Sequence, residues 1–307
     1  MTALCNSWGK KAILAFGPFL ILGGLLIGLF LFSPFRDIEH LADVDLMTML
    51  WMLTGVGAIA GIIPVMIGML WYPFLRTITN KWIFAVMAFS AGVLVFAGVE
   101  MLQGIVNNIG DQPEMGVFIA ILGGGLAFGI LLFAGQWQYT HIKKRSDSGG
   151  LHVAYIIAFG LGLHSIGEGL AIGTAFIQGE ARLMTLLVIA FILDNVTEGP
   201  TIVAAVARDV THPPIHHFLL MGIIAGGPVI LGGWVGSFAE APLMAVFFFA
   251  IGLGAIIEVV WEIIKFVGYS KGESPRSAIT KLNLFTFLLG FVFMVLIDEI
   301  LIDMFLF

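Results

Sequence analysis

Long apolar segments separated by short polar connectors dominate this chain. A helix of about 20 apolar residues spans the hydrocarbon core of a bilayer, and nine segments reach that length. They lie at about 12–32, 48–71, 83–106, 115–138, 151–177, 183–207, 217–238, 243–267 and 282–306. The pattern predicts an all-α integral membrane protein with about nine transmembrane helices.

Positively charged residues fall on one side of this predicted arrangement. Lys and Arg favour the cytoplasmic loops of membrane proteins, and with the N-terminus inside, only Arg36 and Arg182 of the 14 Lys and Arg residues fall outside. A missed or invented helix would invert every later loop, so the helix count and the orientation support each other. We expect a multi-pass protein of the cell membrane, with its N-terminus in the cytoplasm and its C-terminus outside.

No connector is long enough to hold a soluble domain. The longest polar connectors are at 33–47, 139–150 and 268–281. We expect residues 1–47 to form an N-terminal helix with an acidic outer loop, and residues 48–307 to form one helical core. A flexible, basic cytoplasmic loop at 139–150 is expected to divide that core.

The composition excludes several classes of protein. The chain is 59% hydrophobic and 11% charged, which is too little polar surface for a soluble globule of this size. The net charge of -6, with no basic stripe, argues against a nucleic-acid partner. A single cysteine rules out both an intramolecular disulfide and a cysteine-based metal site.

Two acidic phrases, HSIGEG and DNVTEG, interrupt two adjacent predicted helices. Positions i and i+4 lie one turn apart on the same helical face. This spacing places His164 above Glu168 and Asp194 above Glu198. Two such faces packed together would present nitrogen and oxygen donors to one divalent cation. For His164 alone, a hydrogen bond to a neighbouring helix is the alternative interpretation.

Charged groups in the bilayer need compensation, because an ionised Asp at the centre of a membrane helix costs about 2.5–3.5 kcal/mol. No Lys or Arg lies deep in any predicted helix, but five acids do: Glu168, Asp194, Glu198, Glu258 and Glu262. Protonation, pairing with a base or binding of a cation could neutralise them. We expect a cation that alternates with protons. In addition, Pro200 is expected to bend its helix and free main-chain carbonyls near the site.

Other acids are candidates for a cation pathway. Glu258 and Glu262 repeat the i, i+4 spacing, and Glu262 could serve as an exit ligand or form a salt bridge with Lys265. Glu100 falls near the outer end of the third predicted helix, where it could guide cations inward or simply be hydrated. Asp298 is expected to have a structural role.

The two phrases resemble those of the ZIP (Zrt-, Irt-like) metal transporters, whose fourth and fifth core helices carry HNxxEG-like and (H/Q)(E/D)xxEG-like motifs. The SAGVL segment at 90–94 is similar to the second core helix, and EVVWE at 258–262 falls where the seventh ends in a His-Glu pair. The resemblance covers about 48–306. It implies a ZIP-like eight-helix core plus one extra N-terminal helix, a homodimer, and a group of site-carrying helices set against a scaffold.

Carried over by position, the resemblance also implies the ligands. The principal metal site of the family falls on His164, Glu168, Asp194 and Glu198. Its adjacent second site falls on Ser165, Glu168, Asn195, Glu198 and Gly227. In that second set Ser165 replaces an Asn, Asn195 replaces an acid and Gly227 replaces a Glu. Two neighbouring cations need several carboxylates to offset their repulsion, so we predict one bound metal.

Mixed imidazole and carboxylate ligands suit Zn²⁺, with Fe²⁺, Mn²⁺ and Cd²⁺ as alternatives. We therefore expect a transporter, and not an enzyme, that moves divalent transition-metal cations toward the cytoplasm. Two alternatives stay open. A proton-coupled carrier of another solute would use the acids as a relay. A membrane-embedded metallohydrolase would use the cation to activate water, although such sites usually have more protein ligands than one deep histidine supplies.

Overall fold

The computed structural model describes residues 17–18, 20–28, 45–73, 75, 80–110, 112–144, 150–206, 213–269 and 274–302. Every regular element in these ranges is helical, which confirms the all-α prediction. Eight helices of the described part are long and apolar enough to cross a membrane. They correspond to the last eight predicted spans. The first predicted span, 12–32, is described only at 17–18 and 20–28, which are helical.

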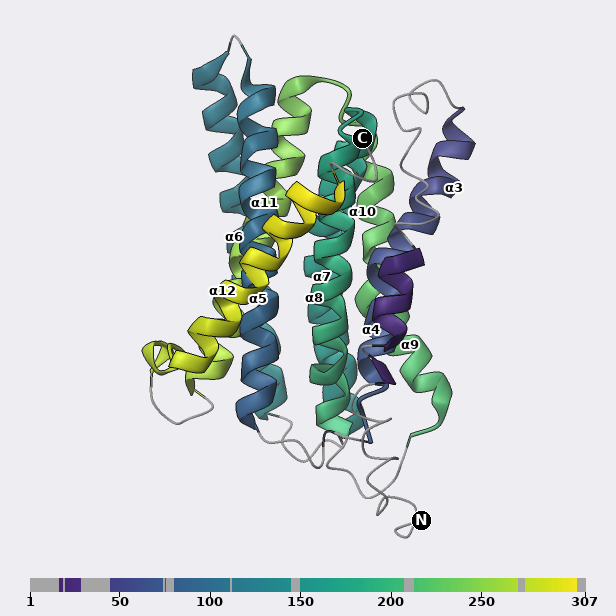
Figure 1. Cartoon of the computed structure of the whole chain (residues 1–307), viewed down its shortest axis with the longest axis vertical. Coiled ribbons are helices and arrows are strands. Elements are labelled where there is room, and N and C mark those ends of the chain that lie inside the picture. Colours follow the sequence, from purple (N-terminus) through teal and green to yellow (C-terminus); the bar gives the residue numbers. More distant parts are fainter. Residues whose placement is uncertain are drawn as a thin grey trace.

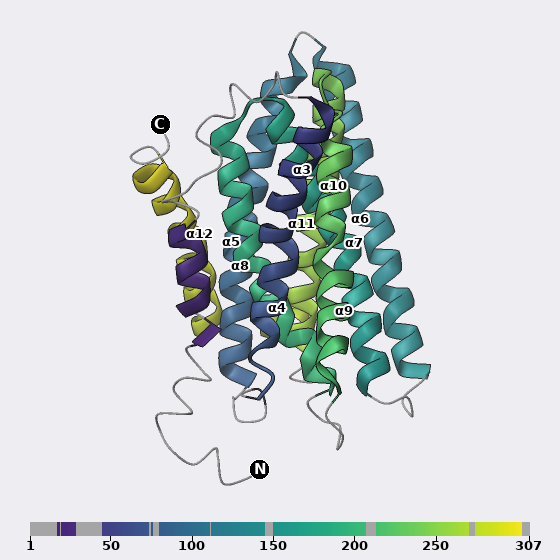
Figure 2. The same ribbon diagram turned by 90° about the vertical axis from the view of Figure 1, so that its right-hand side faces the viewer.

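The described spans run alternately up and down, as Figures 1 and 2 show. The first consists of α3 (Leu46–Gly57), the π-helical η2 (Ala58–Ile62) and α4 (Ile63–Met69). The next four are α5 (Asn80–Ile109), α6 (Pro113–Lys144), α7 (Gly150–Ile177) and α8 (Ala181–Val206). The last three are α9 (Ile215–Gly226) with α10 (Pro228–Gly236), α11 (Pro242–Tyr269), and α12 (Lys281–Leu296) with the π-helical η4 (Ile297–Ile302). A short 3-10 helix, η3 (Pro275–Ala278), precedes α12.

The helices pack in two sets. One set consists of α3, α4, α7, α8, α9 and α10, and the other of α5, α6, α11 and α12, which lie on the left in Figure 1. Contacts of α7 with α11 and of α5 with α8 join the two sets. The first set contains the helices expected to carry the site. Helix α8 is the most enclosed, because residues from Met184 to Ile192 are almost completely buried.

Glycines allow the helices of the first set to touch backbone to backbone. A Cβ atom added at Gly173 of α7 would lie 2.1 Å from the carbonyl oxygen of Gly233 in α10. Such contact is closer than any side chain permits, and small residues at helix interfaces are the usual means of close packing in membranes. Glycines such as Gly173 and Gly233 therefore serve the close packing of these helices.

Pro64 and Pro200 leave two carbonyl groups without their usual helical donors. Proline has no N–H, so the carbonyl four residues before it loses its helical hydrogen bond. For Pro64 this carbonyl belongs to Ala60, which accepts a hydrogen bond from the Asn195 side chain at 3.1 Å. The helix is π-helical over Ala58–Ile62, just before Pro64. A freed carbonyl thus lies beside Asn195 of the predicted site, although the sequence analysis expected such carbonyls from Pro200 and not from Pro64.

The carbonyl group that Pro200 leaves without a donor belongs to Val196, and it makes a different contact from that of Ala60. Helix α8 remains α-helical from Ala181 to Val206, with Pro200 inside it, so the proline does not end the helix. The carbonyl oxygen of Val196 instead faces Gly68 of α4, where an added Cβ would lie 2.2 Å from it. The carbonyl that loses its helical donor therefore packs against the backbone of a neighbouring helix. The interruption in this region falls at Gly227, between α9 and α10.

The predicted loop at 139–150 is shorter than expected. Helix α6 extends to Lys144 and α7 begins at Gly150, so residues 139–144 are helical. The prediction was wrong here because polar residues continue a helix as readily as apolar ones once water can solvate them. Thr140 also donates from its hydroxyl to the carbonyl of Gln136 at 2.7 Å. Residues 145–149 lie outside the described part of the chain.

Candidate metal site

Helices α7 and α8 bring the two acidic phrases together in the interior. The exposed fractions of Glu168, Asp194 and Glu198 are 4%, 1% and 7%. Their charges act on one another, because Asp194 interacts electrostatically with Glu168, Glu198 and His164. Three buried carboxyl groups thus share one region with one imidazole, as the i, i+4 spacing predicted.

Neutral polar groups hold two of these carboxyl groups. Ser90 of α5 donates a hydrogen bond from its hydroxyl to Asp194. Asn195 donates from its amide to Glu168 at 3.0 Å and to the carbonyl of Ala60 at 3.1 Å. Asn195 therefore ties the two phrases to the π-helical turn of the first described span. These donors fix the carboxyl groups without supplying positive charge.

His164 makes its contact across the two helix sets. Its Nε2 atom pairs with the carboxyl group of Glu258 on α11. The alternative interpretation for His164, a hydrogen bond to a neighbouring helix, is therefore correct for this ring nitrogen. The Nδ1 atom is buried and has no hydrogen-bond partner.

The predicted ligands lie near one another but do not converge on a point. Within the described ranges, no three His, Cys, Asp or Glu side chains form a group that could hold a metal ion directly. Three of the four candidates already have a protein contact: His164 with Glu258, Glu168 with Asn195, and Asp194 with Ser90. Ligation of one ion by all four residues would need rotation of these side chains.

The site is also where hydrogen bonding is incomplete. Six buried side-chain atoms of the described residues have no hydrogen-bond partner: His164 Nδ1, Ser165 Oγ, Asp194 Oδ2, Asn195 Oδ1, Glu198 Oε2 and Glu258 Oε1. All six belong to residues that the sequence had singled out. An unpaired buried polar group costs about 1–3 kcal/mol, so these atoms are the ones in the described part that an ion or a water molecule could satisfy.

Two of the predicted second-site residues, Ser165 and Asn195, lie in the same interior, whereas Gly227 is half-buried. Ser165 and Asn195 are fully buried, and each presents an oxygen without a partner. Gly227 joins α9 to α10 and carries no side chain that could bind a cation. The donors at these positions are therefore neutral oxygens, which suits coordination or solvation of one ion better than two.

The three predicted pathway residues differ in their surroundings. Glu258 is completely buried. Glu262 forms an ion pair with Lys265, one of its two predicted alternatives, and its side chain is 39% exposed. Glu100 is half-buried at the upper end of α5 and accepts a long hydrogen bond from Gln103 at 3.4 Å.

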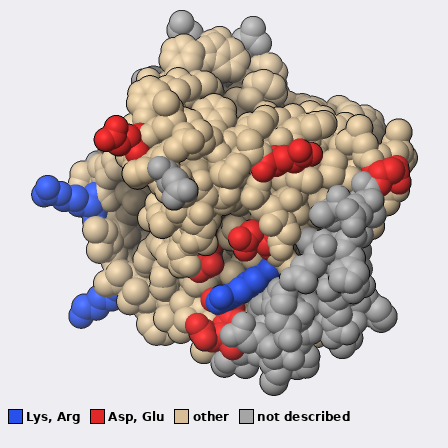
Figure 3. Space-filling model, turned by 90° about the horizontal axis from the view of Figure 1, so that it is seen from above, with Lys and Arg blue, Asp and Glu red and all other residues tan. Residues whose placement is uncertain are grey.

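Glu100 lines a polar cavity of about 120 Å³ at the upper end, together with Glu180, Arg182 and Asn107. Figure 3 views the molecule from this end and shows acidic side chains spread over the face. Among described residues, Asp45, Glu114 and Glu240 are exposed acids of the upper connectors or helix ends. A negative surface at this end would gather cations, within a screening length of about 8 Å at physiological salt.

Arg182 and Asp298 join the two helix sets at the same end. The guanidinium donates through Nε to Asp298 at 2.6 Å and makes a second contact through its terminal nitrogen. Arg182 belongs to α8 and Asp298 to η4. This pair confirms the structural role expected for Asp298.

Removal of Arg182 should destabilise the protein more than removal of the whole pair. In Arg182→Ala the Asp298 carboxylate, whose side chain is only 8% exposed, loses its charged partner at a cost of roughly 1–3 kcal/mol. The double variant Arg182→Ala, Asp298→Ala removes the stranded charge and should recover part of the loss. Wild type, the two single variants and the double variant form a double-mutant cycle, and thermal unfolding of these four proteins in detergent measures the coupling energy between Arg182 and Asp298. Equal melting temperatures for all four would contradict a stabilising pair.

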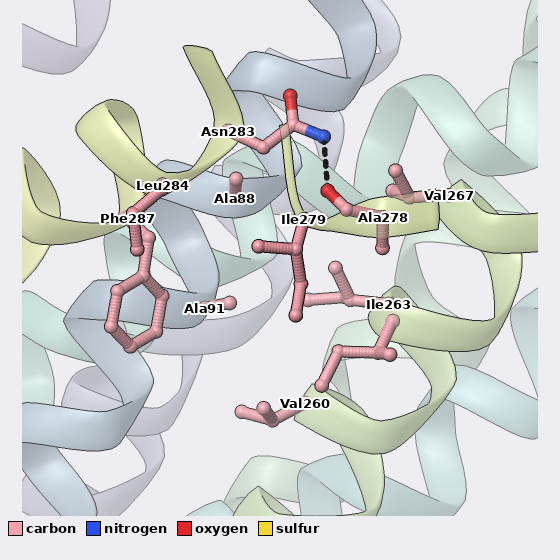
Figure 4. A pocket seen from close by; sticks show the side chains of 11 residues that line it. Ala88, Ala91, Val260, Ile263, Val267, Ala278, Ile279, Asn283, Leu284 and Phe287 are labelled. Atoms are coloured by element: carbon pink, nitrogen blue, oxygen red, sulfur yellow. Dashed lines mark hydrogen bonds between the residues drawn. The ribbon is translucent and has the colours of Figure 1, made fainter. Parts of the chain in front are cut away.

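A second cavity is unsuited to a cation. It has about 160 Å³ and lies between α5, α11 and α12. Figure 4 shows its apolar lining, in which the single polar side chain is Asn283. That amide already donates to the carbonyl of Ala278 at 2.8 Å. The cavity offers no charged ligand.

Sequence reasoning missed two parts of the site. The role of Ser90 as a donor to Asp194 was not predicted, although an isolated Ser in an apolar helix is itself a signal of interhelical hydrogen bonding. The contact between His164 and Glu258 was not predicted either, because it joins residues 94 positions apart.

No known protein-family model and no curated protein sequence matches this chain.

Proposed function

We propose that this protein transports divalent transition-metal cations across the membrane, toward the cytoplasm. Zn²⁺ is the primary candidate substrate, with Fe²⁺, Mn²⁺ and Cd²⁺ as further substrates. The side chains that bind the metal directly are drawn from His164, Glu168, Asp194 and Glu198, with Asn195 and Ser165 as neutral oxygen donors. The chain acts as a carrier of the metal and not as an enzyme.

One observation supports this proposal above all. The buried polar atoms without hydrogen-bond partners, among described residues, gather at the two acidic phrases and the one glutamate that faces them. Nitrogen and anionic oxygen atoms without protein donors are suited to a cation. A divalent ion would supply the positive charge that neither Ser90 nor Asn195 provides.

The chemistry of the ligands favours a borderline transition metal. One imidazole with carboxylate oxygens suits Zn²⁺, Fe²⁺ or Mn²⁺, and the site has no thiolate that would favour Cu⁺. Neutral residues at the second-site positions favour one ion per chain over two. The resemblance of the phrases to ZIP transporters agrees with this reading, and it further suggests a homodimer in the cell membrane with the N-terminus in the cytoplasm.

Metal uptake into proteoliposomes tests the proposal. Wild-type protein should accumulate Zn²⁺ or Cd²⁺ against a protein-free control. His164→Ala and Glu198→Ala should each lower the initial rate by at least about tenfold, because loss even of a residue that only orients a metal ligand typically costs 10- to 100-fold in affinity or activity. Glu114→Ala, which removes an exposed acid at the start of α6, is the matched control and should transport normally.

Two results would contradict the proposal. Undiminished uptake in both site variants would reject the ligand assignment. Absence of metal uptake by wild type, together with proton-driven uptake of an organic solute, would favour the carrier alternative. Metal analysis of the purified protein tests the single-ion prediction, which fails if two ions bind per chain.

A further inference from the structure

The apolar cavity between α5, α11 and α12 lies at the lower end of the protein and opens at its surface. Figure 4 shows the side chains that surround it. Two of them, Ile279 and Leu284, are large apolar side chains with exposed fractions of 73% and 50%, so the wall of the cavity continues into the outer surface. Because α5, α11 and α12 are long and apolar enough to cross a membrane, we expect this opening to face lipid.

The cavity is large enough for part of an acyl chain. Its volume is about 160 Å³, and apolar protein cavities of about 150 Å³ stay dry and bind guests such as benzene. Among the described lining residues, Asn283 has the only polar side chain, and its amide already donates to the carbonyl of Ala278 at 2.8 Å. A hydrocarbon guest therefore suits this lining better than water does.

Two exposed cationic residues flank the cavity-lining residues in the sequence. Arg276 lies in η3, two residues before the lining residue Ala278. Lys281 begins α12, between the lining residues Ile279 and Asn283. Neither cation forms an ion pair with another described residue. The N-terminus of α12 lies here as well, and the positive end of its helix dipole adds to the attraction for an anion.

Aromatic residues indicate the level of the lipid headgroups at this end. Trp82 near the start of α5 and Tyr269 at the end of α11 are both exposed, and Trp and Tyr are enriched where a membrane meets water. Ser277 of η3 donates to the carbonyl of Gly268 at 3.0 Å, which places η3 beside the end of α11. The cavity extends along α11 to Val260, more than two helical turns from Tyr269. The cations thus lie at headgroup level and the cavity lies deeper.

We infer that an anionic phospholipid binds here, with part of one acyl chain in the cavity and its phosphate group near Arg276 and Lys281. One occupant has to match both the apolar cavity and the two cations. A helix of a second copy or a neutral lipid supplies apolar groups without a net negative charge, and inorganic phosphate supplies charge without apolar groups. Basic pockets between transmembrane helices are known to bind the headgroups of anionic lipids. The bound lipid packs between α5, α11 and α12 and stabilises their contact.

Lipid binding to the purified, delipidated full-length protein in detergent tests this inference. Native mass spectrometry measures the affinities for dioleoylphosphatidylglycerol, which is anionic, and for dioleoylphosphatidylcholine, which is zwitterionic. The anionic lipid should bind about tenfold more tightly and should raise the melting temperature, whereas inorganic phosphate alone should leave the melting temperature unchanged. Equal affinity for the two lipids, or equal stabilisation by phosphate alone, would overturn the inference.

Removal of the two cations tests the headgroup contact. The double variant Arg276→Gln, Lys281→Gln should bind phosphatidylglycerol about tenfold or more weakly, because each Lys or Arg near an anionic lipid strengthens binding about fivefold. Its affinity for phosphatidylcholine should stay unchanged. The charge-conserving exchange Arg276→Lys, Lys281→Arg is the matched control and should bind both lipids as wild type does. Wild-type affinity for phosphatidylglycerol in the glutamine variant would reject the inferred site.

A larger side chain in the cavity tests the acyl-chain contact. Ala91 of α5 is buried and lines the cavity, so Ala91→Leu should fill part of the space, weaken phosphatidylglycerol binding several-fold and raise the melting temperature of the lipid-free protein. Ala204→Leu, at an exposed position of α8, is the control and should bind the lipid normally. Unchanged affinity in folded Ala91→Leu would contradict an acyl chain in the cavity. If Ala91→Leu does not fold, the glutamine variant, which changes only exposed residues, still decides.

Discussion

Replacement of Glu198 by leucine should raise the thermal stability of the metal-free protein and abolish metal transport. The Glu198 side chain is 7% exposed, and its Oε2 atom has no hydrogen-bond partner. It also shares the interior with Asp194 and Glu168, so its charged form is repelled by both. Leucine removes the unpaired oxygen and the repulsion together, which should stabilise the fold by about 1–3 kcal/mol.

Thermal unfolding in detergent, with metal chelated, measures the first half of this prediction, and proteoliposome uptake measures the second. Glu198→Gln is the matched control, because it removes the charge but keeps polar atoms that need partners, and it should gain less stability than the leucine variant. A melting temperature below that of wild type for Glu198→Leu would show that Glu198 is structural. A stable variant that still transports would remove Glu198 from the ligand set.

Replacement of Gly173 by alanine should destabilise the protein strongly. The added Cβ would lie 2.1 Å from the carbonyl oxygen of Gly233 and 2.9 Å from the amide nitrogen of Ser237. Both obstacles are backbone atoms of the α10 region, so no side-chain rotation can relieve the clash. Helices α7 and α10 would have to separate, and overpacking of this kind costs about 1–3 kcal/mol.

Gly129→Ala is the control for this substitution. Gly129 lies within α6, and an added Cβ would have no atom within 4 Å. Alanine has the higher helix propensity by about 1 kcal/mol, so this variant should be as stable as wild type or more stable. Thermal unfolding of both proteins measures the contrast. Equal melting temperatures would indicate that the α7–α10 contact is looser than the structure shows.

Much of the fold could be predicted because the bilayer imposes a strong pattern on the sequence. Apolar segments of about 20 residues can only be helices in lipid, and each of the last eight predicted spans corresponds to a described one. The residues at which helices end outside the apolar segments were harder to predict. Residues 139–144 continue α6, because a helix end in water is not marked by a change in hydrophobicity.

Part of the candidate site could be predicted because charged residues stand out within membrane-spanning segments. Acidic residues within apolar segments are conspicuous, and the i, i+4 spacing placed them on shared faces. Their partners depend on how distant helices pack, which the spacing does not specify. Glu258 contacts His164, which is 94 positions away in the sequence. Ser90 contacts Asp194, which is 104 positions away. Such contacts follow from the tertiary arrangement and not from any local pattern.

The π-helical turn at Ala58–Ile62 fixes how α3 is rotated relative to α4. A π turn bonds each N–H to the carbonyl five residues back, whereas an α turn bonds it to the carbonyl four residues back. Each residue of an α-helix advances it by about 100°, so deletion of one residue from this turn would rotate α3 by about that angle relative to Pro64. A different face of α3 would then meet α10, its neighbour in the first helix set.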